Sequence, residues 1–339
     1  MKAAILREFK SPLTIEDVER PKPGPNEVLI EVDACGVCHS DLHVTDGDWP
    51  QIVRITKKPL ILGHEVAGHV VEKGAHVAHL KVGDSVGVPW LHWSCGECDY
   101  CREGNENLCV NQQVTGVTVN GGYAEFVKAP ASHALEIPSG LSSIEAAPLF
   151  CAGVTVYRAL KHANIQPGQR LAVFGVGGLG HLAVQIGVGL GAIVSAVDVS
   201  EEKLVQAKSL GASTTLNATN TNVVKELRRA GSVHAAIVTS ASKAAYDAAF
   251  PCVRGAGMLL VVGLPSESIC FPAISMAASE VRVQASSVGT RQDLREVLAL
   301  AAAGTIRSQV TPRPLAQANE VLSELRRGAI SGRVVLTPR

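Results

Sequence analysis

The sequence lacks the features that mark nucleic-acid-binding and membrane proteins. Its 31 basic and 31 acidic side chains cancel, and charged residues make up only 18% of the chain. A balanced charge argues against nucleic acid or an anionic membrane surface as the main partner. The longest apolar stretch, residues 182–197, contains Gln185 and several glycines and is followed by Asp198, so it predicts a buried helix and strand rather than a membrane span.

The chain is also poor in aromatic residues and shows no secretory signal. The first residues contain no apolar signal-peptide core, so we expect a cytoplasmic protein. Nine cysteines in such a chain point to metal binding or catalysis rather than to disulfides. Aromatics account for 4% of the residues, and the three tryptophans are few enough for each position to be informative. A length of 339 residues is sufficient for two domains, each with its own core.

A glycine-rich turn dominates the second half of the sequence. Four apolar residues are followed by Gly175, Gly177 and Gly180 at G-x-G-x-x-G spacing. The first glycine allows a tight turn, the second lets the backbone approach a pyrophosphate, and the third lets the next helix pack on the strand. Asp198 ends the following strand, where a carboxylate can bind ribose hydroxyls. The pattern predicts dinucleotide binding; the alternative is a glycine turn in an ordinary βαβ unit.

The secondary-structure patterns of the first and second parts of the chain differ. Residues up to about 137 are rich in strand patterns, and 27–32 is the clearest strand. Ser142 and Glu145 then form a capping box that begins a helix. From residue 168 strands and helices alternate, which predicts an α/β fold with a doubly wound parallel sheet. The expected strands there are 171–174, 235–239, 258–262 and 281–285, and the expected helices are 181–190, 200–210 and 244–250.

Four cysteines give the most specific metal pattern. Cys95, Cys98, Cys101 and Cys109 are spaced C-x2-C-x2-C-x7-C. Four thiolates can surround one Zn²⁺ tetrahedrally and leave no position open, which indicates a structural site. An iron–sulfur cluster is the main alternative.

Other candidate ligands are scattered along the first half of the chain. Cys35 and Cys38 could form a redox pair or half of a zinc site, or Cys38 alone could bind a catalytic metal. His64 is followed by Glu65 in a glycine-bounded segment. A buried histidine, or a cysteine in an apolar stretch such as Cys151, is more often a core residue than a ligand.

Together these motifs resemble the zinc-dependent alcohol dehydrogenases of the medium-chain dehydrogenase/reductase superfamily. The segment Gly63-His64-Glu65-x2-Gly68-x5-Gly74-x2-Val77 matches that family's zinc signature, and the cysteine loop and glycine turn follow in the family's order. The resemblance covers the whole chain and is greatest to the bacterial and yeast-type tetrameric branch. It implies a homotetramer, and a GroES-like catalytic domain (1–152 and 288–339) interrupted by an NAD-binding Rossmann domain (153–287).

The resemblance implies roles for the scattered ligands. Cys38, His64 and Cys151 would bind a catalytic zinc and leave a fourth position for water or alcohol. Glu65 would lie behind the metal, and Asp41 would hydrogen-bond the other ring nitrogen of His64. Cys35 matches no ligand position and is expected to be structural.

The implied reaction is the reversible oxidation of an alcohol, with hydride passing from a zinc-bound alkoxide to NAD. The proton would leave through Ser40 and the nicotinamide ribose to His43. No arginine directly follows Asp198, which predicts NAD rather than NADP. The expected cofactor contacts are His39, Thr155, Gly175, Gly177, Gly178, Leu179, Gly180, Asp198, Lys203 and Arg333.

The resemblance also indicates the substrate class. Trp49 and Trp90 would flank the alcohol pocket, whereas Trp93 has no counterpart in the family. Two indoles beside one zinc predict small primary alcohols as substrates; longer, aromatic or secondary alcohols are the alternative. A zinc-free reductase of the same superfamily would lack the ligands, and a non-enzymatic zinc module would leave the glycine turn unexplained.

Overall fold

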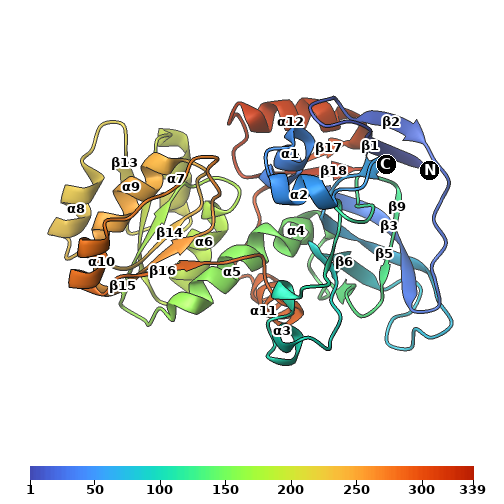
Figure 1. Cartoon of the computed structure of the whole chain (residues 1–339), viewed down its shortest axis with the longest axis horizontal. Coiled ribbons are helices and arrows are strands. Elements are labelled where there is room, and N and C mark those ends of the chain that lie inside the picture. The colour runs from blue at the N-terminus through green and yellow to red at the C-terminus, as the bar shows by residue number, and fades with distance from the viewer. The chain divides into compact units, whose positions relative to one another are not determined.

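Residues 1–339, described by a computed structural model, fall into two units (Figure 1). A β-rich unit comprises residues 1–154, 288–303 and 308–339. A parallel-sheet unit comprises residues 155–287 and 304–307 and is therefore inserted into the first along the chain. None of the helices is both long and apolar enough to pass through a membrane.

The parallel-sheet unit contains a six-stranded sheet in the order β13-β12-β11-β14-β15-β16, and every neighbouring pair is parallel. Its strands are β11 (Arg170–Phe174), β12 (Ile193–Asp198), β13 (Thr214–Asn217), β14 (Val233–Val238), β15 (Val253–Val261) and β16 (Arg282–Ala285). Its helices are α6 (Gly180–Gly189), α7 (Glu201–Ser209), α8 (Val223–Arg229), α9 (Lys243–Ala249) and α10 (Ala273–Ser279), and α5 (Ala152–Ala163) leads into it. The strand order reverses between β11 and β14, as in a Rossmann fold, which confirms the expected doubly wound sheet.

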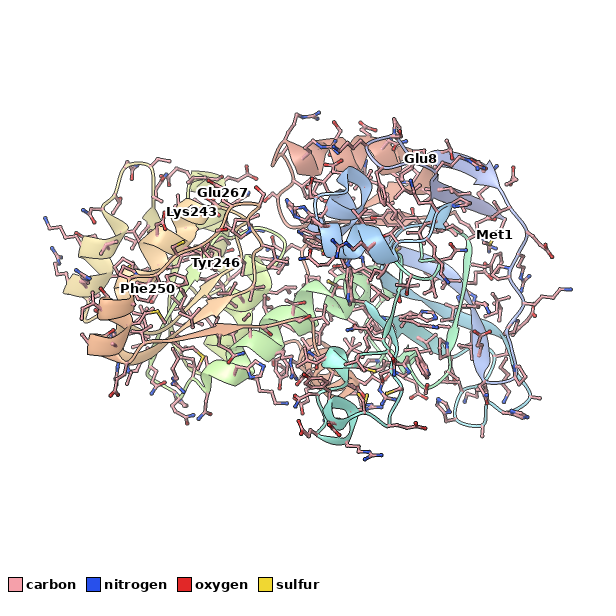
Figure 2. The ribbon with its side chains drawn as sticks, in the orientation of Figure 1. Met1, Glu8, Lys243, Tyr246, Phe250 and Glu267 are labelled. Carbon is pink, nitrogen blue, oxygen red and sulfur yellow. The ribbon has the colours of Figure 1, made fainter.

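Apolar packing holds this sheet between its helices. The middle strands are almost continuously apolar because both faces are covered. Tyr246 is fully buried on α9, and its hydroxyl donates to the carbonyl of Gly263 at 2.5 Å. Phe250 stacks on Phe271 in the same core, and Figure 2 labels Tyr246 and Phe250 on the ribbon of this unit.

The main sheet of the β-rich unit is shared by both ends of the chain. Its order is β10-β6-β5-β3-β18-β17, and β9 also pairs with β3; β2-β1-β4 and β7-β8 form smaller sheets. The strands are β1 (Lys2–Leu6), β2 (Thr14–Asp17), β3 (Glu27–Gly36), β4 (Leu60–Ile61), β5 (Glu65–Lys73), β6 (Ser85–Val88), β7 (Leu91–Trp93), β8 (Gln113–Val114), β9 (Phe126–Pro130), β10 (Leu135–Glu136), β17 (Val310–Pro314) and β18 (Arg333–Thr337). Strands β3 and β5 are antiparallel, and Gly36 lies opposite Glu65.

Short helices lie between these strands. They are α1 (His39–Asp46), α2 (Pro50–Ile55), α3 (Asp99–Arg102), α4 (Ser143–Ala146), α11 (Arg291–Ala302) and α12 (Ala318–Arg326), with 3₁₀ turns η1 (Glu106–Leu108), η2 (Ala147–Phe150) and η4 (Leu315–Gln317); a fourth, η3 (Phe250–Cys252), follows α9 in the other unit. The capping box expected at Ser142 and Glu145 is confirmed at α4. The sequence analysis missed α12, although its buried residues Ala318, Val321, Leu322 and Leu325 have helical spacing.

Two buried histidines make the β-rich unit sensitive to acid. Burial lowers the pKa of His92, and that of His133, from 6.5 to about 4. Below pH ~6.5 these two histidines bind protons in the unfolded chain but not in the folded one, so they leave stability unaffected above this pH and reduce it as the pH falls towards 4. Each histidine should cost about 2 kcal/mol of stability at pH 5.

The measurement compares thermal unfolding of the wild type and an H92Q/H133Q variant at pH 7.5 and pH 5.5, with zinc added to both. We expect the wild type to lose more stability than the variant over this interval. Metal loss affects both proteins, so equal losses would contradict the assignment of the acid sensitivity to these histidines.

Candidate active site and metal centres

Four side chains that could hold a metal ion lie together, buried, in the β-rich unit. Cys38 is the N-cap of α1, Glu65 begins β5 with His64 directly before it, and Cys151 links η2 to α5. One ligand atom from each lies within 4.8 Å of all the others. None of the four residues is more than 6% exposed. The structure thus brings together the three expected catalytic-zinc ligands and the glutamate expected behind them.

Glycines make the approach of these residues possible. Gly63 has φ +91°, a conformation that favours glycine, and a Cβ there would overlap the ring of Tyr123. A Cβ at Gly36 would overlap the carboxylate of Glu65. The backbone therefore turns sharply just before His64, while the opposite strand leaves space for Glu65.

Unpaired polar atoms point to a missing ligand in this cluster. Nδ1 of His64 lies 3.1 Å from Oδ1 of Asp41, but its Nε2 is buried without a partner, as is Oε2 of Glu65. Buried polar atoms are normally hydrogen-bonded. Two thiols and an imidazole nitrogen form a donor set that suits Zn²⁺, and three protein ligands leave a fourth position open. The residues present therefore fit a catalytic zinc.

The surroundings of the cluster shift the pKa values of its members in different directions. A hydrogen bond from Cys151 to the Cys38 sulfur lowers the pKa of Cys38 well below that of a free thiol, against the effect of burial. Burial raises the pKa of Glu65 to about 7, although Arg333 favours the carboxylate. Burial also opposes protonation of His64, but the Asp41 carboxylate outweighs it and raises the pKa of His64.

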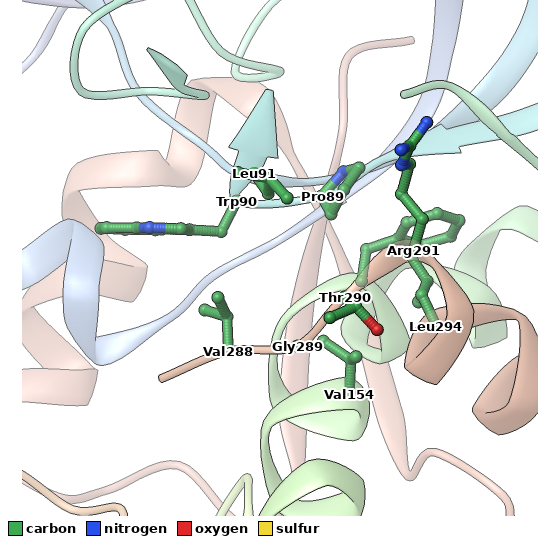
Figure 3. Close-up of a pocket in the computed structure, with 10 residues that line it drawn as sticks. Pro89, Trp90, Leu91, Val154, Val288, Gly289, Thr290, Arg291 and Leu294 are labelled. Atoms are coloured by element: carbon green, nitrogen blue, oxygen red, sulfur yellow. The ribbon is translucent and has the colours of Figure 1, made fainter. Parts of the chain in front are cut away.

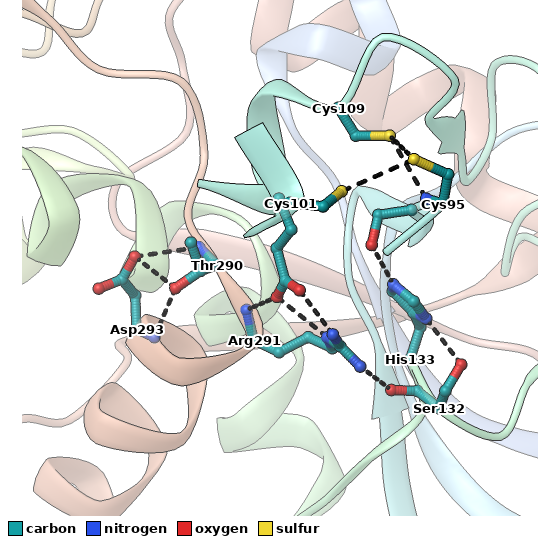
Figure 4. A network of polar contacts seen from close by, with 10 residues as sticks. Cys95, Cys101, Cys109, Ser132, His133, Thr290, Arg291 and Asp293 are labelled. Carbon is teal, nitrogen blue, oxygen red and sulfur yellow. Dashed lines mark hydrogen bonds and ion pairs between the residues drawn. The ribbon is translucent and has the colours of Figure 1, made fainter. Parts of the chain in front are cut away.

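The second metal-ligating group is the cysteine loop. Cys95, Cys98, Cys101 and Cys109 offer sulfurs within 4.8 Å of one another. The Cys95 sulfur lies 3.5 Å from that of Cys109 and 3.9 Å from that of Cys101 (Figure 4). Backbone N–H groups of Cys95 and Cys98 donate to sulfurs at 3.4 Å, which favours thiolates. Four sulfurs with no fifth donor fit a closed, structural zinc site.

A polar network that the sequence analysis missed ties this loop to α11 (Figure 4). Glu106, inside the loop, accepts hydrogen bonds from the backbone N–H of Arg291 at 2.8 Å, from Nε at 2.9 Å and from Nη2 at 2.5 Å. Arg291 also donates to the Ser132 carbonyl, and His133 lies 3.0 Å from the Ser94 hydroxyl. Burial opposes ionisation of Glu106, but Arg291 lowers its pKa. These residues are far apart in sequence, so no spacing pattern relates them.

The glycine turn of the parallel-sheet unit has the geometry of a phosphate cradle. Gly175 turns with φ +89°, and a Cβ at Gly180 would overlap the carbonyl of Gly175. A Cβ at Gly177 would meet nothing within 4 Å, so space is open there. Asp198 ends β12 and accepts hydrogen bonds from the backbone N–H groups of Val176 at 2.6 Å and Ser200 at 3.0 Å. The acid and the glycine turn are therefore neighbours.

The other expected site residues occupy varied positions. Ser40 lies in α1, with its hydroxyl 3.8 Å from the Cys38 sulfur. His43 lies 3.0 Å from the Asp48 carboxylate and stacks on Trp49 at 4.4 Å between ring centroids. His39 begins α1, Thr155 is buried in α5, Lys203 lies in the first turn of α7, and Gly178 and Leu179 complete the glycine turn.

Arg333 is buried rather than exposed. It is 3% exposed and forms an ion pair with Glu65 across the β-rich unit's main sheet. Its Nε has no partner. The partner that the structure shows for this arginine is thus the glutamate behind the candidate zinc site.

Trp90 connects the buried cluster to an apolar cavity that it helps to line (Figure 3). The ring of Trp90 meets that of His64 edge-on, with centroids 4.9 Å apart. Trp49 is absent from the residues that line the cavity, and Trp93 lies in β7. The lining residues are Pro89, Trp90, Leu91, Phe150, Val154, Val288, Gly289, Thr290, Arg291 and Leu294.

Comparisons with known proteins identify both parts of the chain. Residues 24–139 match the family model "Alcohol dehydrogenase GroES-like domain", and residues 178–303 match "Zinc-binding dehydrogenase". An alcohol dehydrogenase of Geobacillus stearothermophilus is 47% identical over 99% of both sequences. The crystal structure of an alcohol dehydrogenase from Aeropyrum pernix aligns with a TM-score of 0.93 at 38% identity and full coverage of both chains. Acetophenone reductase of Geotrichum candidum, solved with NAD, gives a TM-score of 0.88 at 31% identity over 99% of this chain and 96% of that one.

The two metal centres should be separable by mutation. Cys151→Ser should reduce metal content from about two zinc ions per chain to about one and abolish turnover, because a hydroxyl replaces a thiolate ligand poorly. Cys98→Ala should also leave about one zinc ion, but should mainly lower the thermal unfolding temperature, because a structural zinc contributes to folding.

Elemental analysis and thermal unfolding of both variants check this prediction, with Cys35→Ser as the control because Cys35 is buried outside both clusters. Near-wild-type zinc content and turnover in Cys151→Ser would remove Cys151 from the site.

Proposed function

Since this chain belongs to the zinc-dependent alcohol dehydrogenases of the medium-chain dehydrogenase/reductase superfamily, we propose that it oxidises small primary alcohols reversibly with NAD. One observation supports this most directly. The buried Nε2 of His64 has no partner and lies among the thiols of Cys38 and Cys151, and the His64 ring meets that of Trp90, which lines an apolar cavity. A metal held there with an open position would meet an alcohol in a site from which water is excluded.

Each residue of the buried cluster has a proposed task. When bound, zinc supplies the Lewis acidity that favours the ionised form of an alcohol at neutral pH. Cys38, His64 and Cys151 would hold it. Asp41 would fix the ring of His64 with Nε2 towards the metal. Trp90 would provide an apolar wall against the alkyl part of the alcohol.

The parallel-sheet unit would bind the cofactor. Gly177 leaves the space that a pyrophosphate needs, and the N-terminus of α6 offers free N–H groups to it. Asp198 would accept hydrogen bonds from the adenosine ribose, with Lys203 nearby. We propose further contacts from His39, Thr155, Gly175, Gly178, Leu179, Gly180 and Arg333.

A proton must leave the buried site during oxidation. Ser40 would take it up beside Cys38, and His43 would release it to water. The side chain of His43 is 17% exposed and lies beside the carboxylate of Asp48, so it is placed to exchange protons with solvent. An imidazole can both accept and donate a proton, which suits this task.

The protein is proposed to act in the cytoplasm as a homotetramer. All nine cysteines are free thiols, which favours a reducing compartment such as the cytoplasm. The tetrameric branch to which the sequence is similar favours a homotetramer. Gel filtration with light scattering would measure the assembly.

Asp198 should determine cofactor choice. Its carboxylate would bind the ribose hydroxyls of NAD and repel the 2′-phosphate of NADP. We expect NAD to be preferred by at least ~100-fold in kcat/KM, which corresponds to about 3 kcal/mol. Asp198→Gly should relax this preference, whereas Asp247→Ala, at an exposed acid of the same unit, should not. Comparable kcat/KM values for both cofactors in the wild type would refute the role of Asp198.

A substrate panel tests the proposed function itself. The wild type should oxidise ethanol and butanol with higher kcat/KM than cyclohexanol or 2-octanol, because Trp90 narrows the site. Trp90→Ala should raise kcat/KM for the longer and branched alcohols relative to ethanol, whereas Trp93→Ala should not. A wild type that prefers cyclohexanol would overturn the narrow-pocket assignment. A protein with only one zinc ion per chain and no NADH formation would overturn the proposed function and favour a non-enzymatic zinc module.

A further inference from the structure

We propose that Tyr123 is a positioning residue of the catalytic metal site, which acts through Asp41 on two of the metal ligands. The proposal rests on the proposed function only in requiring a metal at Cys38, His64 and Cys151. The hydroxyl of Tyr123 donates to Asp41, so its effect would be exerted through this one buried carboxylate.

The carboxylate of Asp41 contacts both of these ligands. Oδ1 lies 3.1 Å from Nδ1 of His64, and Oδ2 accepts a hydrogen bond from the backbone N–H of Cys38 at 2.9 Å. The hydroxyl of Tyr123 donates to the same Oδ2, also at 2.9 Å. Asp41 and Tyr123 are both essentially inaccessible to water. The tyrosine hydroxyl therefore helps to fix the plane of the carboxylate that orients His64 and anchors the start of α1.

Tyr123 is itself held against the segment that carries His64. Its backbone N–H donates to the carbonyl of Leu62 at 2.9 Å, and its carbonyl accepts from the N–H of Ala4 at 2.8 Å. Its ring packs where a Cβ at Gly63 would stand. The tyrosine is anchored beside His64 and donates a hydrogen bond to Asp41. It therefore holds both the histidine segment and the aspartate carboxylate in the positions that their contact requires.

Loss of this hydroxyl should loosen the metal without removing a ligand. Without the tyrosine hydroxyl, the buried Oδ2 of Asp41 would accept a hydrogen bond only from the backbone N–H of Cys38. The carboxylate could then rotate away from His64. Residues that support metal ligands typically change metal affinity or activity by about 10–100-fold when altered. We therefore expect Tyr123→Phe to release the catalytic metal at least ~10-fold faster, because phenylalanine preserves the ring packing but not the donor.

The experiment uses the full-length protein loaded with Co²⁺ at the catalytic site and Zn²⁺ in the cysteine loop. Metal release to a chelator is followed through the cobalt absorption bands. Tyr123→Phe should shift these bands and speed release, and should lower kcat while leaving KM for NAD unchanged. The matched control is Tyr246→Phe, which also removes a buried tyrosine hydroxyl but in the other unit. The control should leave the bands and the release rate as in the wild type.

A second pair of variants separates positioning from general destabilisation. Asp41→Asn should speed metal release by itself, and adding Tyr123→Phe should then have little further effect, because the tyrosine acts through the carboxylate. Additive effects of the two changes, or a Tyr123→Phe protein that releases cobalt at the wild-type rate, would overturn the proposal. Failure of the wild type to bind metal at this cluster would instead overturn the proposed function.

Discussion

The pairing of β3 with β5 is the constraint on which the candidate active site depends. Its register places Gly36 opposite Glu65, so His64, which directly precedes β5, and Cys38, two residues after the end of β3, come together. The missing side chain at Gly36 leaves room for the glutamate. Strand β18 pairs with β3 and brings Arg333 to Glu65 from the far end of the sequence. A shift of one residue in the β3–β5 register would turn Glu65 to the other face of the sheet.

A feature could be predicted from the sequence when its residues lie close together along the chain, and could not when they lie far apart. The sulfurs of residues 95–109 meet because one loop carries them, and the glycine turn follows from the order strand, turn and helix. The pairs Arg291–Glu106, Arg333–Glu65 and Tyr123–Asp41 join residues far apart in the chain. Their contacts depend on strand order and register, which no local spacing specifies, so only the structure shows them.

The two metal-ligating groups differ in the way that their surroundings hold them. The cysteine loop is partly exposed and is secured by its own backbone N–H groups and by the Arg291–Glu106 ion pair. Its four sulfurs leave no free position for a substrate. The buried group offers two thiols, an imidazole nitrogen and a carboxylate that is already paired with Arg333. The ring of His64 in this group meets that of Trp90, which lines an apolar cavity. Four sulfurs around one metal therefore suit a structural role for the cysteine loop. A donor set without a fourth thiol suits chemistry at the buried group.

The buried ion pair of Glu65 and Arg333 is difficult to explain as a source of stability. Removing two charges from water costs several kcal/mol per ion, which a single contact repays only when the remaining polar atoms are also satisfied. Here Oε2 of Glu65 and Nε of Arg333 have no partners. The pair thus leaves hydrogen-bonding capacity unused directly behind the thiols of the metal-ligating group. Such a cost is reasonable where the site is built for a ligand, because a metal or another bound group can then interact with charges that the fold already holds in place.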